Sequence, residues 1–201
     1  MPYSVNDERQ IVGWCEDEHG KCCPCLWTNT HPELFEDRGF GGVALQINNE
    51  GTIVGEVGLS RSGNIAVARW HLGNLQLFEP PAPYYTARAF RINNHGLAVG
   101  YLMQDGKPSD FFVWPLAGTP TIVGRGEAYG VNDEGWVAGQ DGDKGAFLFR
   151  ENKFIWLDDI VDTSWKIMWP FRLINDLRMV GVGKRHSIDR AVLLVPRYLT
   201  P

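Results

Sequence analysis

The sequence predicts an all-β protein, a five-bladed β-propeller with four antiparallel strands per blade and about 40 residues per repeat. Two motifs that recur in phase and the absence of sustained helical periodicity support this prediction. The first motif has the pattern Ile-Asn-Asn-Glu-Gly-Thr-Ile-Val-Gly. It is found at Val5–Gly13, Ile47–Gly55, Ile92–Gly100, Val131–Gly139 and, in a shortened form, Ile174–Gly181.

The motifs define a repeat of regular length. The asparagines at 6, 48, 93, 132 and 175 are 42, 45, 39 and 43 residues apart. A second, apolar motif follows each first one. Its copies are Cys25-Leu26-Trp27, Ala68-Arg69-Trp70, Phe112-Val113-Trp114, Phe147-Leu148-Phe149 and Val192-Leu193-Leu194. A period near 40 is typical of four-stranded propeller blades. We therefore divide a single domain, 1–201, into repeats at 1–38, 39–81, 82–125, 126–160 and 161–201.

Each repeat is expected to contain four strands. In the third copy these are Ala87–Ile92, Leu97–Leu102, Asp110–Pro115 and Pro120–Val123. In the fourth they are Ala128–Val131, Trp136–Gly139, Gly145–Arg150 and Lys153–Leu157. Asn-Asn-His-Gly between the first two strands of the third copy has the composition of a hairpin turn.

Many strands are apolar on both faces, as in Phe111–Trp114, which indicates that both faces are covered. Blades stacked around a closed ring meet this requirement, and an open β-solenoid is the rival architecture. The terminal copies deviate. Arg9 and Arg178 are interpreted as replacing the turn glycine, and only Tyr198–Pro201 remain for the last fourth strand.

Composition excludes several functional classes. With 44% hydrophobic and 21% charged residues the chain is typical of a globular protein, and its net charge of −5 disfavours nucleic acid or an anionic membrane as a partner. No apolar stretch is long enough to span a bilayer. Met1–Ser4 lead directly into the first repeat, so we expect no signal peptide and a cytoplasmic location. If a leader has been removed, the protein would instead be extracellular or periplasmic.

The two motifs resemble the repeats of HAF-type proteins, whose consensus is close to I-N-D-x-G-x-I-V-G followed by A-F-x-W. The last repeat is similar as well, from Trp165 through Leu173–Asp176 and Val180–Gly183 to Arg190–Leu194. The resemblance covers almost the whole chain. It implies a propeller-like β-fold and, in many members, an extracellular location, but no known reaction and no catalytic residues.

The four cysteines lie in one short window, Cys15, Cys22, Cys23 and Cys25. Cys15 and Cys22 flank a hairpin loop and could form a local disulfide. Together with His19 and Cys23 or Cys25 they could instead bind zinc. Zinc sites usually contain two pairs of ligands with a short spacing, whereas this chain has a single cluster of cysteines with one histidine. In addition, Cys25 replaces a core phenylalanine, so reduced or locally disulfide-bonded thiols are the commoner interpretation.

The loops between second and third strands and the connections between blades are longer and more variable than the turns. We expect them to form one long-loop face that binds a ligand. Tyr84 and Tyr85, after a proline-rich stretch, and Trp165, outside the repeat pattern, are the predicted exposed contacts, although covering blade edges is an equal alternative. All three are placed on this face.

Acidic side chains are the other candidates. Glu36-Asp37 and Asp158-Asp159 occupy equivalent connections, where two carboxyl pairs could hydrolyse a glycoside or bind calcium. Gln140–Asp143 adds a fragment of a calcium loop. Solvated loop charge is the commoner role of such residues.

These observations favour a non-enzymatic binding or scaffold protein that recognises a protein partner, or a glycan, through the long-loop face. A glycoside hydrolase with acidic residues on that face, including Asp158, and a lectin with sites between blades are the alternatives. The sequence does not specify the oligomeric state.

Overall fold

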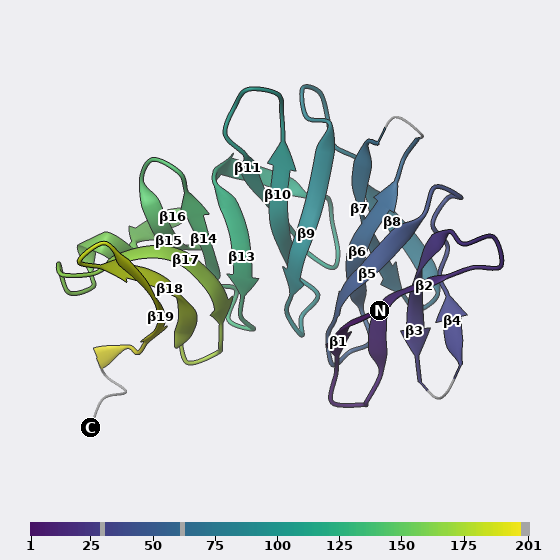
Figure 1. The fold of residues 1–201 in the computed structure, drawn as a ribbon, viewed down its shortest axis with the longest axis horizontal. Coiled ribbons are helices and arrows are strands. Elements are labelled where there is room, and N and C mark those ends of the chain that lie inside the picture. Colours follow the sequence, from purple (N-terminus) through teal and green to yellow (C-terminus); the bar gives the residue numbers. More distant parts are fainter. Residues whose placement is uncertain (29–30, 61–62, 198–201) are drawn as a thin grey trace.

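The computed structural model describes residues 1–28, 31–60 and 63–197 and confirms an all-β fold of antiparallel sheets. The first meander contains β1 (Pro2–Val5), β2 (Ile11–Glu16), β3 (Cys22–Trp27) and β4 (Pro32–Leu34). The second contains β5 (Gly42–Ile47), β6 (Ile53–Gly58), β7 (Ile65–His71) and β8 (Asn74–Phe78). The third contains β9 (Thr86–Ile92), β10 (Ala98–Met103), β11 (Asp110–Trp114) and β12 (Thr121–Arg125). These strands occupy the N-terminal and central parts of Figure 1.

The C-terminal part contains two further meanders. The fourth comprises β13 (Glu127–Val131), β14 (Val137–Asp141), β15 (Gly145–Arg150) and β16 (Lys153–Trp156), followed by a 3-10 turn, η1 (Leu157–Asp159). The fifth comprises β17 (Lys166–Leu173), β18 (Met179–Arg185) and β19 (Ile188–Leu194). Its fourth strand, which was predicted from Tyr198–Pro201, falls outside the described residues. A short parallel pairing of Ile65 with Thr86 joins the second and third meanders into one sheet.

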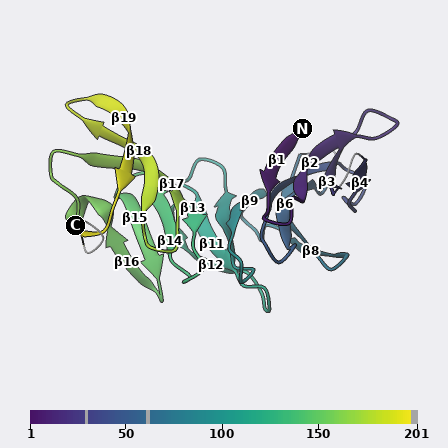
Figure 2. The ribbon, with the colours of Figure 1, turned by 90° about the horizontal axis from the view of Figure 1, so that it is seen from below.

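The five meanders lie side by side along an open arc, which is clearest in Figure 2. Successive first strands pack on one another from β1 to β17, whereas β1 and β17 lie at opposite ends and the predicted ring does not close. The exposure of the terminal sheets reflects this opening. Val5 is 62% exposed, while its equivalent Ile47 is 4% exposed; Val180 is 47% exposed, while its equivalent Val54 is fully buried.

The last glycine of the first motif is required by a β-bulge in each first strand. In the second sheet Gly55 is opposite Ala44 and Val54 is opposite Gln46, so Leu45 is the extra residue. The bulge brings the carbonyl oxygen of Val43 so close that a Cβ at Gly55 would lie 2.0 Å from it. The same close approach occurs at Gly13, Gly100, Gly139 and Gly181. A side chain at any of these glycines would therefore push the bulged strand away.

The hydrophobic core lies between neighbouring sheets. Phe78 of β8, for example, packs edge-on against Phe112 at a centroid distance of 5.0 Å, and Phe111 of β11 packs against Phe147 at 5.2 Å. Apolar side chains on both faces of the inner sheets make these contacts, as the sequence predicted. This stacking holds each meander in its place along the arc.

One cation is built into this core. Arg69 of β7 is fully buried, and its guanidinium lies 3.9 Å from the centre of the Trp114 ring. Its nitrogen atoms donate to the carbonyl oxygens of Gly96, Trp114, Pro115 and Leu116. Desolvation by burial lowers the pKa of Arg69 to about 10. The four carbonyl bonds favour the charged form, so we treat Arg69 as a cation that joins the second and third sheets.

The turn of the last repeat is one residue out of step with the prediction. Its closing hydrogen bond runs from the Leu177 amide to the Ile174 carbonyl, equivalent to Gly51 donating to Asn48. Leu177, with a φ of 64°, therefore occupies the turn-glycine position, and the assignment of Arg178 to it was wrong. The error arose because Ile174, not Asn175, is the structural equivalent of Asn48. The first motif of this repeat consequently has its full length and runs from Leu173 to Gly181.

Candidate functional site

A buried ladder of asparagine side chains lines the turn end of the arc. Nδ2 of Asn48 donates to the carbonyl oxygen of Asn93 at 2.8 Å, and Nδ2 of Asn93 donates to that of Asn132 at 2.8 Å. The ladder begins with Asn6 donating to Asn48 at 3.1 Å and ends with Asn132 donating to Ile174 at 3.3 Å. Each of these asparagines also accepts a bond from its own turn, so both ends of the amide are used.

A second ladder runs beside the first, at the next residue of each repeat. The backbone amide of Asn49 donates to Oδ1 of Asn94 at 3.1 Å, and that of Asn94 donates to Oδ1 of Asp133 at 2.8 Å. Burial opposes ionisation of Asp133, but hydrogen bonds from Asn94 and Asn175 hold its pKa below the usual value. The Asp133 carboxylate is therefore ionised and engaged by neighbouring amides.

The two ladders form the rim of a central cavity of about 700 Å³ on the concave side of the arc. All five meanders contribute to its wall, through the ends of β1, β5, β9, β13 and β17. The residue after each bulge lines this cavity, and here the repeats differ. The five residues are Ser4, Gln46, Arg91, Gly130 and Arg172, of which Gly130 has no side chain. The repeated backbone thus presents a wall of variable chemistry.

Positive charge is concentrated on one side of this wall. Arg91 is half-buried and Arg172 is exposed, and no carboxylate of the described residues lies within ion-pair distance of either. Arg91 donates from Nη1 to the carbonyl oxygen of Phe90 at 2.8 Å, which fixes its direction. Burial, and then repulsion by Arg172, lowers the pKa of Arg91. The two arginines thus line the same cavity without a counter-ion among the described residues.

A polar cluster links the second, third and fourth sheets beyond the bulges. Arg88 Nε lies 3.8 Å from Glu56 Oε1, and Glu127 accepts hydrogen bonds from Ser109 at 2.9 Å and from the Tyr129 hydroxyl. Burial raises the pKa of Glu56, with Arg88 opposing the shift. Because Glu127 is engaged on both oxygens, this cluster resembles an inter-sheet contact more than a reactive pair of acids.

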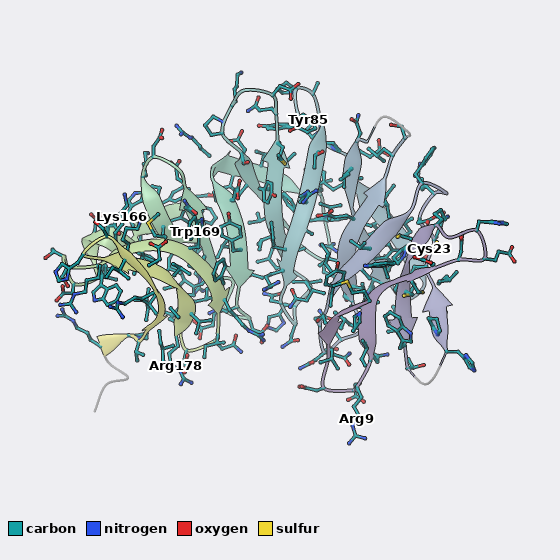
Figure 3. The ribbon with its side chains drawn as sticks, in the orientation of Figure 1. Arg9, Cys23, Tyr85, Lys166, Trp169 and Arg178 are labelled. Atoms are coloured by element: carbon teal, nitrogen blue, oxygen red, sulfur yellow. The ribbon has the colours of Figure 1, made fainter. Side chains whose placement is uncertain are left out.

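Tyr84 and Tyr85 lie in the connection between β8 and β9, where both are half-buried. The Tyr84 hydroxyl donates to Oδ2 of Asp110 at 2.6 Å, and the ring packs on the core between the second and third sheets. The Tyr85 amide donates to Met103 at 3.0 Å. Tyr84 is thus used in packing. Figure 3 shows Tyr85 over the middle of the arc, away from Lys166 and Trp169 of the fifth sheet.

Trp165 lines a separate groove of about 860 Å³ between the fourth and fifth sheets. Its ring is half-buried beside Gly183, and the guanidinium of Arg185 lies 5.6 Å from the ring centre. Most of the wall is apolar, with Trp136, Leu157 and Val192 among the contributors. Tyr84 and Tyr85 are not part of this groove, so the three predicted aromatic contacts do not converge.

The acidic candidates serve local structure. Asp158 and Asp159 are exposed on η1, and Asp158 Oδ1 accepts a bond from the Ile167 amide at 3.3 Å. Asp37 is buried and pairs with Lys21 at 3.0 Å, at the other end of the arc. The two acidic pairs are therefore not brought together.

The calcium-loop fragment, Gln140–Asp143, also makes contacts with neighbouring residues. Oδ1 of Asp141 accepts bonds from the amides of Asp143 at 2.8 Å and Lys144 at 3.0 Å, which fix the β14–β15 turn. The carboxylate in addition lies 3.6 Å from Arg125 Nε. Glu36 contributes its carbonyl oxygen to the Trp70 indole at 3.0 Å. These contacts hold the residues in their positions.

All four cysteines are free thiols. Cys15 is opposite Cys23 across β2 and β3, and Cys25 is fully buried. Burial, and then a hydrogen bond with Cys15, raises the pKa of the Cys25 thiol. Cys22 and His19 are exposed at the hairpin, where His19 lies beside Glu18. Within residues 1–28, 31–60 and 63–197 no three metal-ligating side chains gather into one group.

Comparison with known proteins does not assign the chain to a class. No protein-family profile matches it, and no curated protein matches it significantly. In the part of the chain that the structure covers, no helix is long and apolar enough to cross a bilayer.

Proposed function

We propose that the chain is a non-enzymatic binding module, built from five propeller-type blades with HAF-like repeats, that holds an anionic ligand on its concave surface. The supporting observation is the pair Arg91 and Arg172, which lines a cavity of about 700 Å³ and has no carboxylate partner among the described residues. A carboxylate or phosphate group between them would relieve their repulsion and accept several charge-assisted hydrogen bonds.

The repeat itself supports this location. The Asn ladders and the bulge glycines are common to the repeats and build the arc. Because they are shared, they do not determine which ligand is bound. The side chain after each bulge differs in every sheet but one pair, Arg91 and Arg172. A binding site at the variable position of a rigid scaffold is the arrangement expected of a recognition protein. The proposal thus moves recognition from the long-loop face to the concave surface.

The acids on the rim do not cancel this positive charge. Asp133 accepts bonds from Asn94 and Asn175, and Asp7 accepts one from Nδ2 of Asn49 at 2.6 Å. Their charge is thus directed along the second ladder, whereas the two arginines belong to the strand ends. We expect the ligand to present its anionic group to the arginines and its polar remainder to Ser4 and Gln46.

Calorimetric titration at constant ionic strength with inorganic phosphate and with citrate tests the proposal. We expect Arg91→Gln and Arg172→Gln each to weaken binding about tenfold, which corresponds to about 1.4 kcal/mol, and the double variant to abolish it. Lys153→Gln, at an exposed site on the outer strand β16, is the matched control and should bind like the wild type. Equal binding by the wild type and the double variant for both anions would refute the proposal.

A further inference from the structure

Among the residues that the structure describes, the third strand of the last sheet has no partner on its outer edge. In the first four meanders the third strand is paired on both sides, with β4, β8, β12 or β16 on the outer side. Within the described residues β19 pairs only with β18, across seven positions from Ile188 to Leu194. An unpaired strand edge presents backbone donors and acceptors to any extended chain that can reach it.

The groove that contains Trp165 lies directly beside this edge. Val192 and Leu194 of β19 form one wall, and Leu148 and Leu157 of the fourth meander form the other. Its volume of about 860 Å³ is enough for several side chains. The edge and the groove together therefore offer both backbone pairing and apolar burial.

The other sheets show which side chains such a strand carries. Val192 is opposite the motif glycine Gly181, so its equivalents are Cys25, Ala68, Phe112 and Phe147. The outer-strand residues opposite these four are Leu34, Leu77, Ile122 and Trp156, all of them apolar. In the first, second and fourth meanders, the outer-strand residues opposite the equivalents of Leu194 are Pro32, Leu75 and Phe154. The outer strand thus carries apolar residues at positions i and i+2.

We propose that the β19 edge and its groove bind an extended segment of a partner protein by antiparallel strand addition. The segment has apolar side chains at i, opposite Leu194, and at i+2, opposite Val192. Backbone hydrogen bonds to β19 supply affinity, and the groove selects the two apolar side chains, as in other strand-addition complexes. This site is separate from the anion cavity, and the inference does not depend on the proposed function.

The chain supplies its own probe, a synthetic peptide of residues 73–79 (Gly-Asn-Leu-Gln-Leu-Phe-Glu), which contains strand β8. Titrated into isotopically labelled full-length protein, it should shift the β19 amide resonances and slow their hydrogen exchange. A peptide with Leu75→Asp and Leu77→Asp should leave them unchanged. This second peptide keeps the test valid whatever the folding of any protein variant.

Two protein variants complete the design. Trp165→Ala removes a large aromatic side chain from the lining of the groove and should weaken peptide binding at least tenfold, with folding checked by circular dichroism. Val180→Lys, at an exposed position of β18 outside the groove, should bind within twofold of wild type. The double variant of Arg91 and Arg172 should also retain peptide binding.

Three outcomes would overturn the inference. The first is equal binding by the two peptides, or shifts that map away from β19. The second is slow exchange of the outward β19 amides in the free monomer, which would mean that the chain's own C-terminal residues cover the edge. The third is a dimer of the free protein that Trp165→Ala converts to monomer, which would assign the edge to a second copy.

Discussion

Nδ2 of Asn48 donates to the carbonyl oxygen of Asn93 at 2.8 Å, while Oδ1 of Asn48 accepts the Thr52 amide at 2.8 Å. One side chain therefore closes its own turn and binds the next repeat. Asn48→Ala leaves the buried Thr52 amide without its side-chain acceptor. We expect a loss of about 2–3 kcal/mol in the free energy of unfolding, measured by urea denaturation.

The neighbouring asparagine is the matched control for this prediction. The Asn49 side chain makes ladder bonds too, accepting the Asp7 amide and donating to the Asp7 carboxylate, but it is exposed, so water can replace them. Asn49→Ala should cost less than about 1 kcal/mol. Equal losses for the two variants would mean that the buried ladder does not hold the repeats together.

The bulge glycine yields a second prediction. A Cβ at Gly55 would lie 2.0 Å from the backbone oxygen of Val43, and a backbone atom cannot move aside as a flexible side chain can. Gly55→Ala is therefore expected to destabilise the protein by about 3 kcal/mol or more. Thermal and urea unfolding, monitored by tryptophan fluorescence, provide the measurement.

A substitution at Gly135 is the control that distinguishes the steric effect at Gly55 from ordinary backbone strain. It has a φ of 81° and nothing within 4 Å of an added Cβ. Gly135→Ala should cost only about 1–2 kcal/mol, the strain of a left-handed residue. If Gly135→Ala were the more damaging variant, steric contact would not explain the last glycine of the motif.

Local features of the fold were predictable from the sequence. The turns that begin with Asn and the apolar motifs on either side specify hairpins over short distances. The order of the strands therefore followed directly from the repeats. The opening of the arc was not predictable from the repeats, because the angle between sheets depends on packing between residues far apart in sequence. The asparagine of the motif was interpreted as a turn residue only, since the same residue type suits both a turn and an inter-repeat bond.

Prediction of the site was less complete. Trp165 was singled out because it departs from the repeat, and it lines the groove beside β19. Tyr84 was chosen for its proline-rich surroundings, yet its hydroxyl is bonded to Asp110. Arg91 and Arg172 were missed, because their shared position is recognisable only when the bulge before the motif is known. The variable residue that precedes Ile47, Ile92 and Leu173 was the available signal.

The corrected turn register makes a third prediction. Arg9 is exposed with a φ of 61°, whereas in the last repeat the left-handed residue is Leu177 rather than Arg178. Arg9→Gly relieves left-handed strain and should stabilise the protein by about 0.5–1 kcal/mol. Arg178→Gly breaks a contact with Asp176 at 2.7 Å without relieving strain, so it should be neutral or destabilising. Figure 3 labels both arginines. Stabilisation by Arg178→Gly, measured by differential scanning calorimetry, would contradict the register.

A pH dependence follows from Tyr84. Its bond to Asp110, together with burial, raises the pKa of Tyr84 to about 12, above the value of about 10 of an unfolded tyrosine. The folded state therefore retains a proton that the unfolded state loses. The stability contributed by this bond is complete below about pH 10 and is lost as the pH rises towards 12.

Tyr84→Phe removes this contribution while keeping the ring in the core. The variant should be about 1 kcal/mol less stable than wild type at pH 8, and the difference should shrink as the pH approaches 12. Urea unfolding at a series of pH values measures it, and absorbance titration should show one fewer late-ionising tyrosine. Tyr3→Phe is the control, because Tyr3 is 48% exposed and its replacement should leave the urea unfolding curves unchanged. A constant difference between wild type and Tyr84→Phe from pH 8 to 12 would show that the Tyr84 hydroxyl does not resist ionisation in the folded protein.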